Sequence, residues 1–362
     1  MILNKPLNIG FVSRSTLYSS PGGDTVQIEM TAKYLNRLGQ NVKVFRSDET
    51  INYKEFDVFH FFNITRPADM LSHVLKAQKP FFISPIYLDL DEFETKNRRG
   101  FQGLIAKILN SSRLEYLKCI ARYMRNGEKV NSWQYFLLGH FNSMQKLLKK
   151  CNAILPNSYS EYQRIQNSFG YKGYYEVIPC GVDTEIFEVA VPQKDENLIL
   201  CIGRIEGRKN QLSLIKALYN TDYQLVIIGN PSPNHKAYYE ACKKAANERV
   251  TFIENIEQKE LIKYYQKAKV HVLASWFETV GLSSLEAAFC NCNIVVCDKG
   301  DVSDYFKQNV WYCSPDDEKD ILRAVRAAMS APLSEVMKNE IQEKYTWEIA
   351  AKKTLEAYQS YL

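Results

Sequence analysis

The sequence predicts an α/β protein made of two Rossmann-like domains that face each other across a cleft. Short apolar segments alternate with segments whose apolar residues recur at helical spacing, a pattern typical of a parallel sheet covered by helices. The alternation begins with strand 8–12, helix 25–38 and strand 42–45, and it starts again at residue 198 after an interruption. A chain of 362 residues is also long for a single hydrophobic core.

Residues 1–188 form the predicted N-terminal domain. Its later strands are expected at 56–62, 81–84, 153–155 and 176–178. Residues 95–150 interrupt the alternation and are expected to form a basic, mostly helical insertion. The polar segment 189–197, which contains Pro192, is interpreted as the linker to the second domain.

Residues 197–345 form the predicted C-terminal domain. Its strands are expected at 198–202, 224–228, 250–252, 270–274 and 293–297. Helices are expected at 210–219, 235–247, 260–268 and 283–290. A helical region follows, and we expect residues 346–362 to be a helix that packs back on the N-terminal domain.

The composition is typical of a soluble globular protein, with 46% hydrophobic and 24% charged residues. No apolar run reaches the about 18 residues of a membrane-spanning helix, and the N-terminus lacks the apolar segment of a signal peptide. Nine cysteines without a paired framework indicate reduced thiols, and the spacing of Cys290, Cys292 and Cys297 matches no zinc site. We therefore expect a cytoplasmic protein without a metal or cofactor.

The charge is unevenly distributed along the chain. Residues 1–150 carry 22 basic and 13 acidic side chains, a net charge of +9, whereas the remainder carries 24 and 28, a net charge of −4. Residues 96–150 alone hold 12 basic and 2 acidic side chains, interleaved with apolar residues. This pattern favours a basic amphipathic helix on an anionic membrane surface, although a solvated basic face or a nucleic-acid site would give the same pattern.

The most informative segment runs from Glu278 through Gly281 to Glu286. Because a strand precedes this segment and a helix follows, Glu278 and Gly281 are expected in a turn at the carboxyl end of a strand. Open α/β sheets bind ligands at this edge, and a helix N-terminus offers free N–H groups to a phosphate. The layout fits a molecule with hydroxyls on both sides of a diphosphate, such as a nucleotide sugar. Two solvated glutamates near a helix end would give the same spacing.

A second turn and helix follow strand 198–202. Gly203 opens this turn, and Arg204 and Lys209 flank a further glycine, Gly207. Two fixed cations, together with helix amides, can stabilise the negative charge of a departing diphosphate without a metal. A pair of surface cations in a loop is the alternative.

Other candidate residues give weaker signals. Gly22 and Gly23 precede the first helix and would allow a ligand to approach its amides closely, although a plain flexible turn is equally consistent. The Asp-Leu-Asp segment at 89–91 could hold a divalent metal, but we interpret it as part of an exposed acidic loop. His140 and His271 are interpreted as structural residues.

Taken in order, these segments resemble the family 4 retaining glycosyltransferases, whose two-domain fold is called GT-B. The resemblance covers nearly the whole chain. Each segment alone is a weak match, but the order of the segments makes the resemblance specific. The matching segments are Gly22-Gly23, residues 178–187, residues 203–210, residues 250–252 and residues 275–287.

The resemblance implies roles for the matching residues of the C-terminal domain. Glu278 would face the donor sugar, and Glu286 would bind ribose hydroxyls. Arg204 and Lys209 would hold the diphosphate, with Gly203 beside them. Backbone groups of one turn would hold the sugar and phosphate, namely those of Thr279, Val280, Gly281 and Leu282.

The resemblance also implies an activity. A sugar would move from a UDP- or GDP-sugar to a glycan or lipid-linked acceptor, with retention and without a metal, in cell-surface polysaccharide assembly. Gly22 and Gly23 would line the acceptor side of the cleft. Members of the family often lie on the cytoplasmic face of the membrane, so the resemblance implies a peripheral protein on the inner face of the cell membrane, without a nucleic-acid partner. A nucleotide-sugar epimerase, or another acceptor-independent enzyme of the same fold, is the alternative.

The sequence departs from the family at one position. Many members carry a histidine after the strand that ends here at Ser84, and this chain has none. His60, Tyr87 or Asp89 could take part of its task, and we assign no catalytic base.

Overall fold

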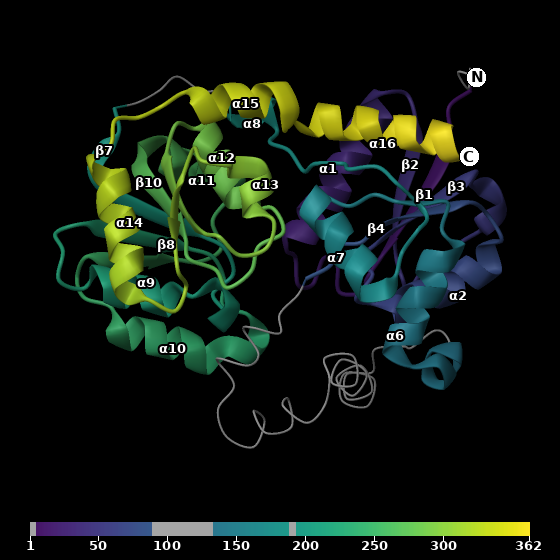
Figure 1. Cartoon of the computed structure of the whole chain (residues 1–362), viewed down its shortest axis with the longest axis horizontal. Helices are drawn as coiled ribbons and strands as arrows, with labels where there is room; N and C mark the ends of the chain where they lie inside the picture. Colours follow the sequence, from purple (N-terminus) through teal and green to yellow (C-terminus); the bar gives the residue numbers. More distant parts are fainter. Residues whose placement is uncertain (1–4, 89–132, 188–192) are drawn as a thin grey trace. The chain divides into compact units, whose positions relative to one another are not determined.

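The computed structural model describes residues 5–88, 133–187 and 193–362, which fall into two compact units. Unit 1 comprises the described parts of Met1–Cys180 together with Trp347–Leu362, and unit 2 comprises those of Gly181–Thr346. Each unit contains a parallel six-stranded sheet with helices on both faces (Figure 1). The predicted α/β fold with two Rossmann-like domains is therefore confirmed.

The sheet of unit 1 has the order β2-β1-β3-β4-β5-β6, and all neighbouring strands are parallel. The strands are β1 Asn8–Ser13, β2 Asn41–Arg46, β3 Val58–Phe62, β4 Phe81–Ser84, β5 Ala153–Ile154 and β6 Tyr174–Tyr175. The sequence predicts the last strand at 176–178, but the structure places this strand, β6, earlier, at Tyr174–Tyr175. Glu176 and Ile178 still donate backbone hydrogen bonds to Ile154 and Pro156, but beyond the short regular ladder.

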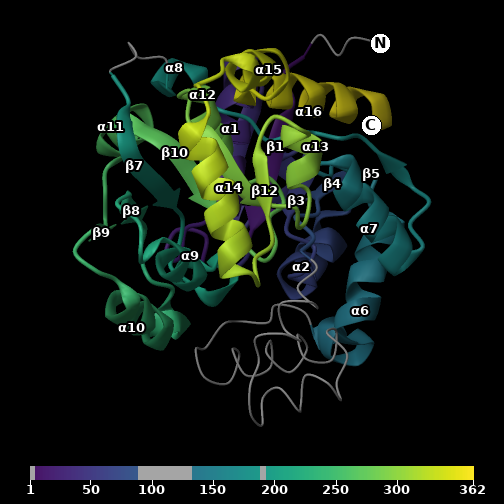
Figure 2. The same ribbon diagram turned by 60° about the vertical axis from the view of Figure 1, so that its left-hand side comes forward.

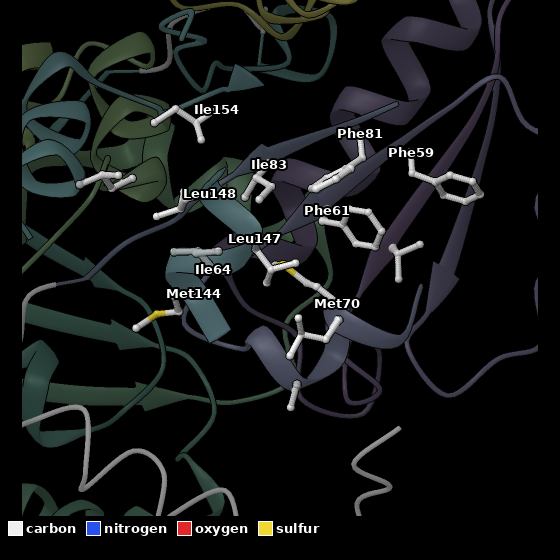
Figure 3. Packing of buried hydrophobic residues seen from close by; sticks show 14 of the residues in the cluster. Phe59, Phe61, Ile64, Met70, Phe81, Ile83, Met144, Leu147, Leu148 and Ile154 are labelled. Atoms are coloured by element: carbon white, nitrogen blue, oxygen red, sulfur yellow. The ribbon is translucent and has the colours of Figure 1, made fainter. Parts of the chain in front are cut away.

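The two faces of this sheet are covered by different helices. These are α1 Gly23–Arg37, α2 Pro67–Ala77, α6 Trp133–Lys150, α7 Tyr159–Phe169 and α16 Trp347–Tyr361, with the short helix η1 Tyr53–Glu55. Alternate residues of β3 point to opposite faces. Phe59 and Phe61 pack with Met70 of α2 and Leu147 of α6 in the main core (Figure 3). His60 points the other way and contacts α16, which also packs on α1.

Only part of the predicted basic insertion is described. Residues 133–150 form α6, as expected, but Gly139 has non-helical angles of φ 75° and ψ 175° and divides the helix. The remainder of the insertion and the acidic segment 89–91 lie outside the described residues. None of the helices in the described part of the chain has the length and apolar character needed to cross a membrane.

The sheet of unit 2 has the order β12-β11-β10-β7-β8-β9, again with parallel neighbours. The strands are β7 Asp195–Ile202, β8 Gln224–Ile228, β9 Val250–Ile253, β10 Ala268–Leu273, β11 Asn293–Cys297 and β12 Trp311–Cys313. We expected only helices after residue 297. The structure shows strand β12 there, so this prediction was wrong. A strand of three residues is too short to show an alternating pattern.

The helices of unit 2 pack on both faces of its sheet. They are α8 Thr184–Phe187, α9 Gln211–Leu218, α10 Lys236–Ala245, α11 Gln258–Lys267, α12 Leu282–Phe289, α13 Val302–Phe306, α14 Glu318–Ser330 and α15 Val336–Lys344, with the short helices η2 Gly207–Lys209 and η3 Pro233–His235. On one face, α9 and α14 pack on a core that includes Ile199, Val272 and Val295, and Figure 2 shows α14 beside β12. On the other face, His271 of β10 contacts Tyr265 of α11 and Ser284 of α12. The eight cysteines that the structure describes are free thiols.

Candidate functional site

Two predicted site segments leave neighbouring strands at the same edge of the unit 2 sheet. We call residues 203–210 the β7 loop and residues 274–281 the β10 loop. β7 and β10 pair in parallel, with Ile199 opposite Val270. The chain passes from β7 to β8 and β9 on one side and then crosses to β10, β11 and β12 on the other, so the strand order reverses between β7 and β10. Doubly wound sheets bind ligands at this point, beyond the carboxyl ends of the strands.

Glu278 in the β10 loop pairs with Lys209 at the end of the β7 loop. Lys209 Nζ donates a hydrogen bond of 2.6 Å to Glu278 Oε1, and only 14% and 10% of the two side chains is exposed. Burial alone raises the pKa of Glu278, but the charges of Lys209 and Arg208 outweigh it and hold that pKa below its ordinary value. Glu278 is therefore an ionised carboxylate beside two cations at neutral pH.

Arg208 links the two loops, a contact that we did not predict. Its Nη1 donates to the carbonyl oxygen of Phe277 at 2.8 Å and lies 3.8 Å from Glu278 Oε1. Its Nη2 donates to Glu206 Oε1 at 2.9 Å. The sequence shows a basic residue beside Lys209, but its spacing does not reveal where the side chain points.

Arg204 has a different environment from the other two cations. Its side chain is 40% exposed, and its Nη2 lies 4.0 Å from Glu206 Oε1. The structure therefore places Lys209 directly against Glu278, whereas Arg204 remains accessible to solvent at the start of the β7 loop.

Glycines allow the backbone around Glu278 to pack closely. Gly300, which follows β11, has a φ of +86°, and a Cβ atom there would lie 2.1 Å from the carbonyl oxygen of Glu278. Glu278 N donates to Lys299 O at 3.2 Å, and Asp301 N donates to Glu278 O at 2.8 Å. At the start of the β7 loop, a Cβ atom on Gly229 would lie 2.1 Å from the carbonyl oxygen of Gly203. Both loops are thus fixed by backbone contacts.

Helix α12 begins directly after the β10 loop. Gly281 precedes it with a φ of +73°, a left-handed conformation that favours glycine. Thr279 and Val280 lie in the turn, and Leu282 is the first helical residue. The first turn of α12 carries no acidic side chain, so its N–H groups and its partial positive charge can attract an anion.

Glu286 lies one turn into α12 and is bound by a tyrosine. The hydroxyl of Tyr265 on α11 donates to Glu286 Oε2 at 2.6 Å. Burial raises the pKa of Glu286 to about 7, although the tyrosine hydrogen bond opposes the shift. The carbonyl oxygen of Tyr265 accepts a hydrogen bond of 2.9 Å from buried Lys194, which also donates to Cys290 O at 2.7 Å. Glu286 is therefore a partly buried, hydrogen-bonded residue and not a fully solvated one.

The predicted site residues of unit 1, Gly22 and Gly23, lie at the start of helix α1. Gly22 precedes α1 with a φ of −155°, and Gly23 is the first residue of that helix. Arg14 binds the Asp24 carboxylate through Nε and Nη2, at 2.7 and 3.0 Å. It also donates to the carbonyl oxygen of Ser20 at 2.9 Å, so it folds the loop that leads into α1.

His60 is a buried residue of unit 1 with both ring nitrogens hydrogen-bonded. It is 1% exposed, and its ring nitrogens bond the hydroxyls of Tyr358 at 2.7 Å and Ser84 at 2.9 Å. Burial lowers its pKa to about 3, so the ring is neutral at physiological pH. The backbone N–H of Tyr87 donates to Glu161 Oε1 at 2.7 Å, and Asp89 lies outside the described residues. Within the described part of the chain, no cluster of three or more His, Cys, Asp or Glu side chains could hold a metal ion.

Residues 182–346, nearly the whole of unit 2, match the family model for glycosyl transferases group 1. This match supports the resemblance to glycosyltransferases seen in the sequence.

Curated relatives match part of the chain. A probable sucrose-phosphate synthase of Thermosipho melanesiensis is 29% identical over 194 residues, covering 49% of this chain and 46% of that protein. The O-antigen chain mannosyltransferase of Salmonella typhimurium is 26% identical over 199 residues, covering 53% and 56%. The matched region thus spans about half the length of these relatives.

Solved structures resemble the chain over nearly its full length. A sucrose-phosphate synthase from Thermosynechococcus elongatus has a TM-score of 0.76 at 15% identity, covering 98% of both chains. The Anabaena protein HepE in complex with UDP and glucose has a TM-score of 0.69 at 13% identity, covering 98% of this chain and 100% of that one. At these identities the likeness concerns the fold alone, which is GT-B.

Proposed function

We propose that the chain is a retaining, metal-independent glycosyltransferase. It moves a sugar from a UDP- or GDP-sugar to a glycan or lipid-linked acceptor, in cell-surface polysaccharide assembly. The observation that carries this proposal is the ionised Glu278 carboxylate, held by Lys209 at the reversal point of a doubly wound sheet. The family-model match over residues 182–346 and relatives named as mannosyltransferase and sucrose-phosphate synthase support it.

The proposed reaction exchanges one bond for another at the anomeric carbon. An acceptor hydroxyl oxygen bonds to that carbon, and the bond from the carbon to the diphosphate oxygen breaks, with its electron pair leaving on the diphosphate. Negative charge therefore grows on the diphosphate, where Arg204, Lys209 and the N-terminus of α12 supply positive charge. The hydroxyl proton passes to the departing diphosphate or to water, and we assign no side chain as a base.

The remaining site residues have proposed roles around this reaction. Glu278 accepts hydrogen bonds from hydroxyls of the donor sugar, and Glu286 accepts them from the ribose. The backbone from Thr279 to Leu282, together with Gly203, holds the sugar and phosphates. Gly22 and Gly23 contribute to the acceptor side.

A turnover assay tests this function. We expect release of the nucleoside diphosphate from one member of a panel of UDP- and GDP-sugars, undiminished by a chelator. Arg204→Ala should lower turnover at saturating donor by about 100-fold, the usual effect of removing one charge-stabilising group. Activity that requires a divalent metal would contradict the metal-independent mechanism. Conversion of the donor without any acceptor, to an epimer rather than to free sugar, would favour the epimerase alternative.

Association with the inner membrane surface is a separate proposal. In the described part of the basic insertion, α6 exposes Trp133, Leu137 and Phe141 and ends with Lys149 and Lys150. Apolar and basic side chains together favour an anionic bilayer. The protein should bind vesicles containing phosphatidylserine, and binding should weaken as salt rises because the charges are screened. Absence of binding at low salt would refute the membrane proposal.

A further inference from the structure

We propose that Arg208 is a positioning residue that fixes Glu278 against the donor sugar. This inference rests on the proposed function of the site. It assigns to Arg208 a role toward the sugar part of the donor and not toward its phosphates.

Arg208 holds the two residues that precede Glu278. Its carbonyl oxygen accepts a hydrogen bond from the backbone N–H of Trp276 at 2.9 Å. Its guanidinium donates to the carbonyl oxygen of Phe277 at 2.8 Å. One residue of the β7 loop therefore binds two consecutive backbone groups of the β10 loop, so a shift of Arg208 would displace Glu278.

The guanidinium is itself fixed by a buried carboxylate. Glu206 Oε1 accepts from Arg208 Nη2 at 2.9 Å, and Glu206 Oε2 accepts from the hydroxyl of Ser232 at 2.9 Å. Ser232 lies in the loop after β8 and donates its own N–H to Ile205 O at 3.2 Å. The arrangement thus joins the loops that follow β7, β8 and β10 into one hydrogen-bonded group.

The planar shape of the guanidinium is needed for this task. Its two terminal nitrogens reach different acceptors, Phe277 O and Glu206 Oε1, at the same time. A lysine at this position keeps the positive charge but is a point donor that cannot reproduce the fork. Arg208→Lys therefore separates the geometric role from the charge. The side chain of Arg208 is 16% exposed against 40% for Arg204, which leaves Arg204 as the more accessible cation for a phosphate.

The test compares binding of a nucleoside diphosphate with turnover of the corresponding nucleotide sugar. For Arg208→Lys we expect a nucleoside diphosphate Kd within about threefold of wild type and a kcat lower by about 100-fold, since small misplacements of reactive groups have effects of this size. Arg323→Lys is the matched control, because Arg323 forms a surface ion pair with Asp320 and is 61% exposed. It should leave both quantities unchanged.

Four outcomes would overturn the inference. A loss of nucleoside diphosphate affinity as large as the loss of kcat would indicate that Arg208 is a phosphate ligand. An unchanged kcat with a lowered Tm would make its role structural only. If Arg208→Lys does not fold, Glu206→Gln removes the charge of the supporting carboxylate at equal size, and an unchanged kcat in that variant would overturn the inference as well. Failure of the wild-type protein to turn over any donor would instead overturn the proposed function together with this role.

Discussion

Lys209 Nζ lies 2.6 Å from Glu278 Oε1, although the two residues are 69 positions apart and follow different strands. The pair joins the β7 loop to the β10 loop at the point where the strand order of unit 2 reverses. Lys209 binds the Glu278 carboxylate and lowers its pKa, so the carboxylate is held ionised and in a fixed orientation. Electrostatic groups that are oriented in advance lose little energy to reorganisation during a reaction.

We predict that the two residues are strongly coupled in stability. Lys209→Met leaves Glu278 largely buried and with one cation fewer, and it should lower the free energy of unfolding by about 3 kcal/mol. The double variant Lys209→Met/Glu278→Gln should recover part of this loss, because no uncompensated charge remains. Urea unfolding of the two single variants and the double variant measures the coupling. Strictly additive losses would show that the two side chains do not interact.

Glu286 should make the stability of the protein depend on pH. Its pKa of about 7 lies above the ordinary value of 4.5, so the folded protein retains a proton that the unfolded chain loses between these values. The stability contributed by this proton is complete below pH 4.5 and is lost as the pH rises to about 7. As the pH rises from 5 to 8, the free energy of unfolding of Glu286→Gln should therefore increase by up to about 3 kcal/mol relative to that of the wild type. A constant difference between the two proteins across this range would contradict the raised pKa.

Tyr265 should control the pH at which nucleotide binding is lost. Binding of the ribose is proposed to need the Glu286 carboxylate, so affinity should rise as the pH increases through about 7. The Tyr265 hydrogen bond lowers the pKa of Glu286, and its removal in Tyr265→Phe should move the midpoint to higher pH. Isothermal titration with a nucleoside diphosphate at several pH values gives the midpoint. A midpoint that stays in place would argue against this hydrogen bond.

Gly300 offers a test of the close packing around Glu278. Gly300→Ala would place a Cβ atom 2.1 Å from Glu278 O and should displace the β10 loop, with a loss of stability and of donor turnover. Gly39 is a matched control, because its φ of +80° resembles the +86° of Gly300 while nothing lies within 4 Å of its Cβ position. Gly39→Ala should cost about 1 kcal/mol from backbone strain and leave turnover intact. Equal effects in both variants would assign the loss to strain alone.

His60 and Tyr358 connect the sheet of unit 1 to α16. Tyr358→Phe removes the hydroxyl that bonds His60 Nδ1 at 2.7 Å and leaves a buried ring nitrogen without this partner. It should destabilise the protein by about 1–3 kcal/mol. Tyr174→Phe is the control, because Tyr174 is 68% exposed and should change stability by less than about 0.5 kcal/mol. Denaturant unfolding compares the two variants, and equal stabilities would rule out this anchoring role.

The sequence predicted the elements that have a regular pattern. Strands β7, β8 and β10 were expected close to their observed positions, since each has a run of apolar residues long enough to recognise. The turn around Gly281 was also predictable, because a strand, a glycine and a helix follow one another directly. Strand β12 escaped prediction because it has three residues.

Contacts between distant residues could not be predicted in this way. Arg208, Tyr265 and Gly300 meet the predicted glutamates only after the sheet of unit 2 has formed, and periodicity within a segment carries no information about such partners. The sequence likewise suggested Arg204 and Lys209 as an equivalent pair. In the structure Lys209 is buried against Glu278, whereas Arg204 is 40% exposed.

The most direct test of the proposed transferase is donor turnover by Glu278→Ala in the presence of a chelator, with binding of the nucleoside diphosphate measured alongside. We predict that the wild-type protein releases the nucleoside diphosphate from its donor without a metal. The variant should retain nucleoside diphosphate binding and lose turnover by about 100–1000-fold, because Glu278 is proposed to contact the sugar and not the nucleotide. Turnover of Glu278→Ala equal to that of the wild-type protein would contradict the assignment of this site.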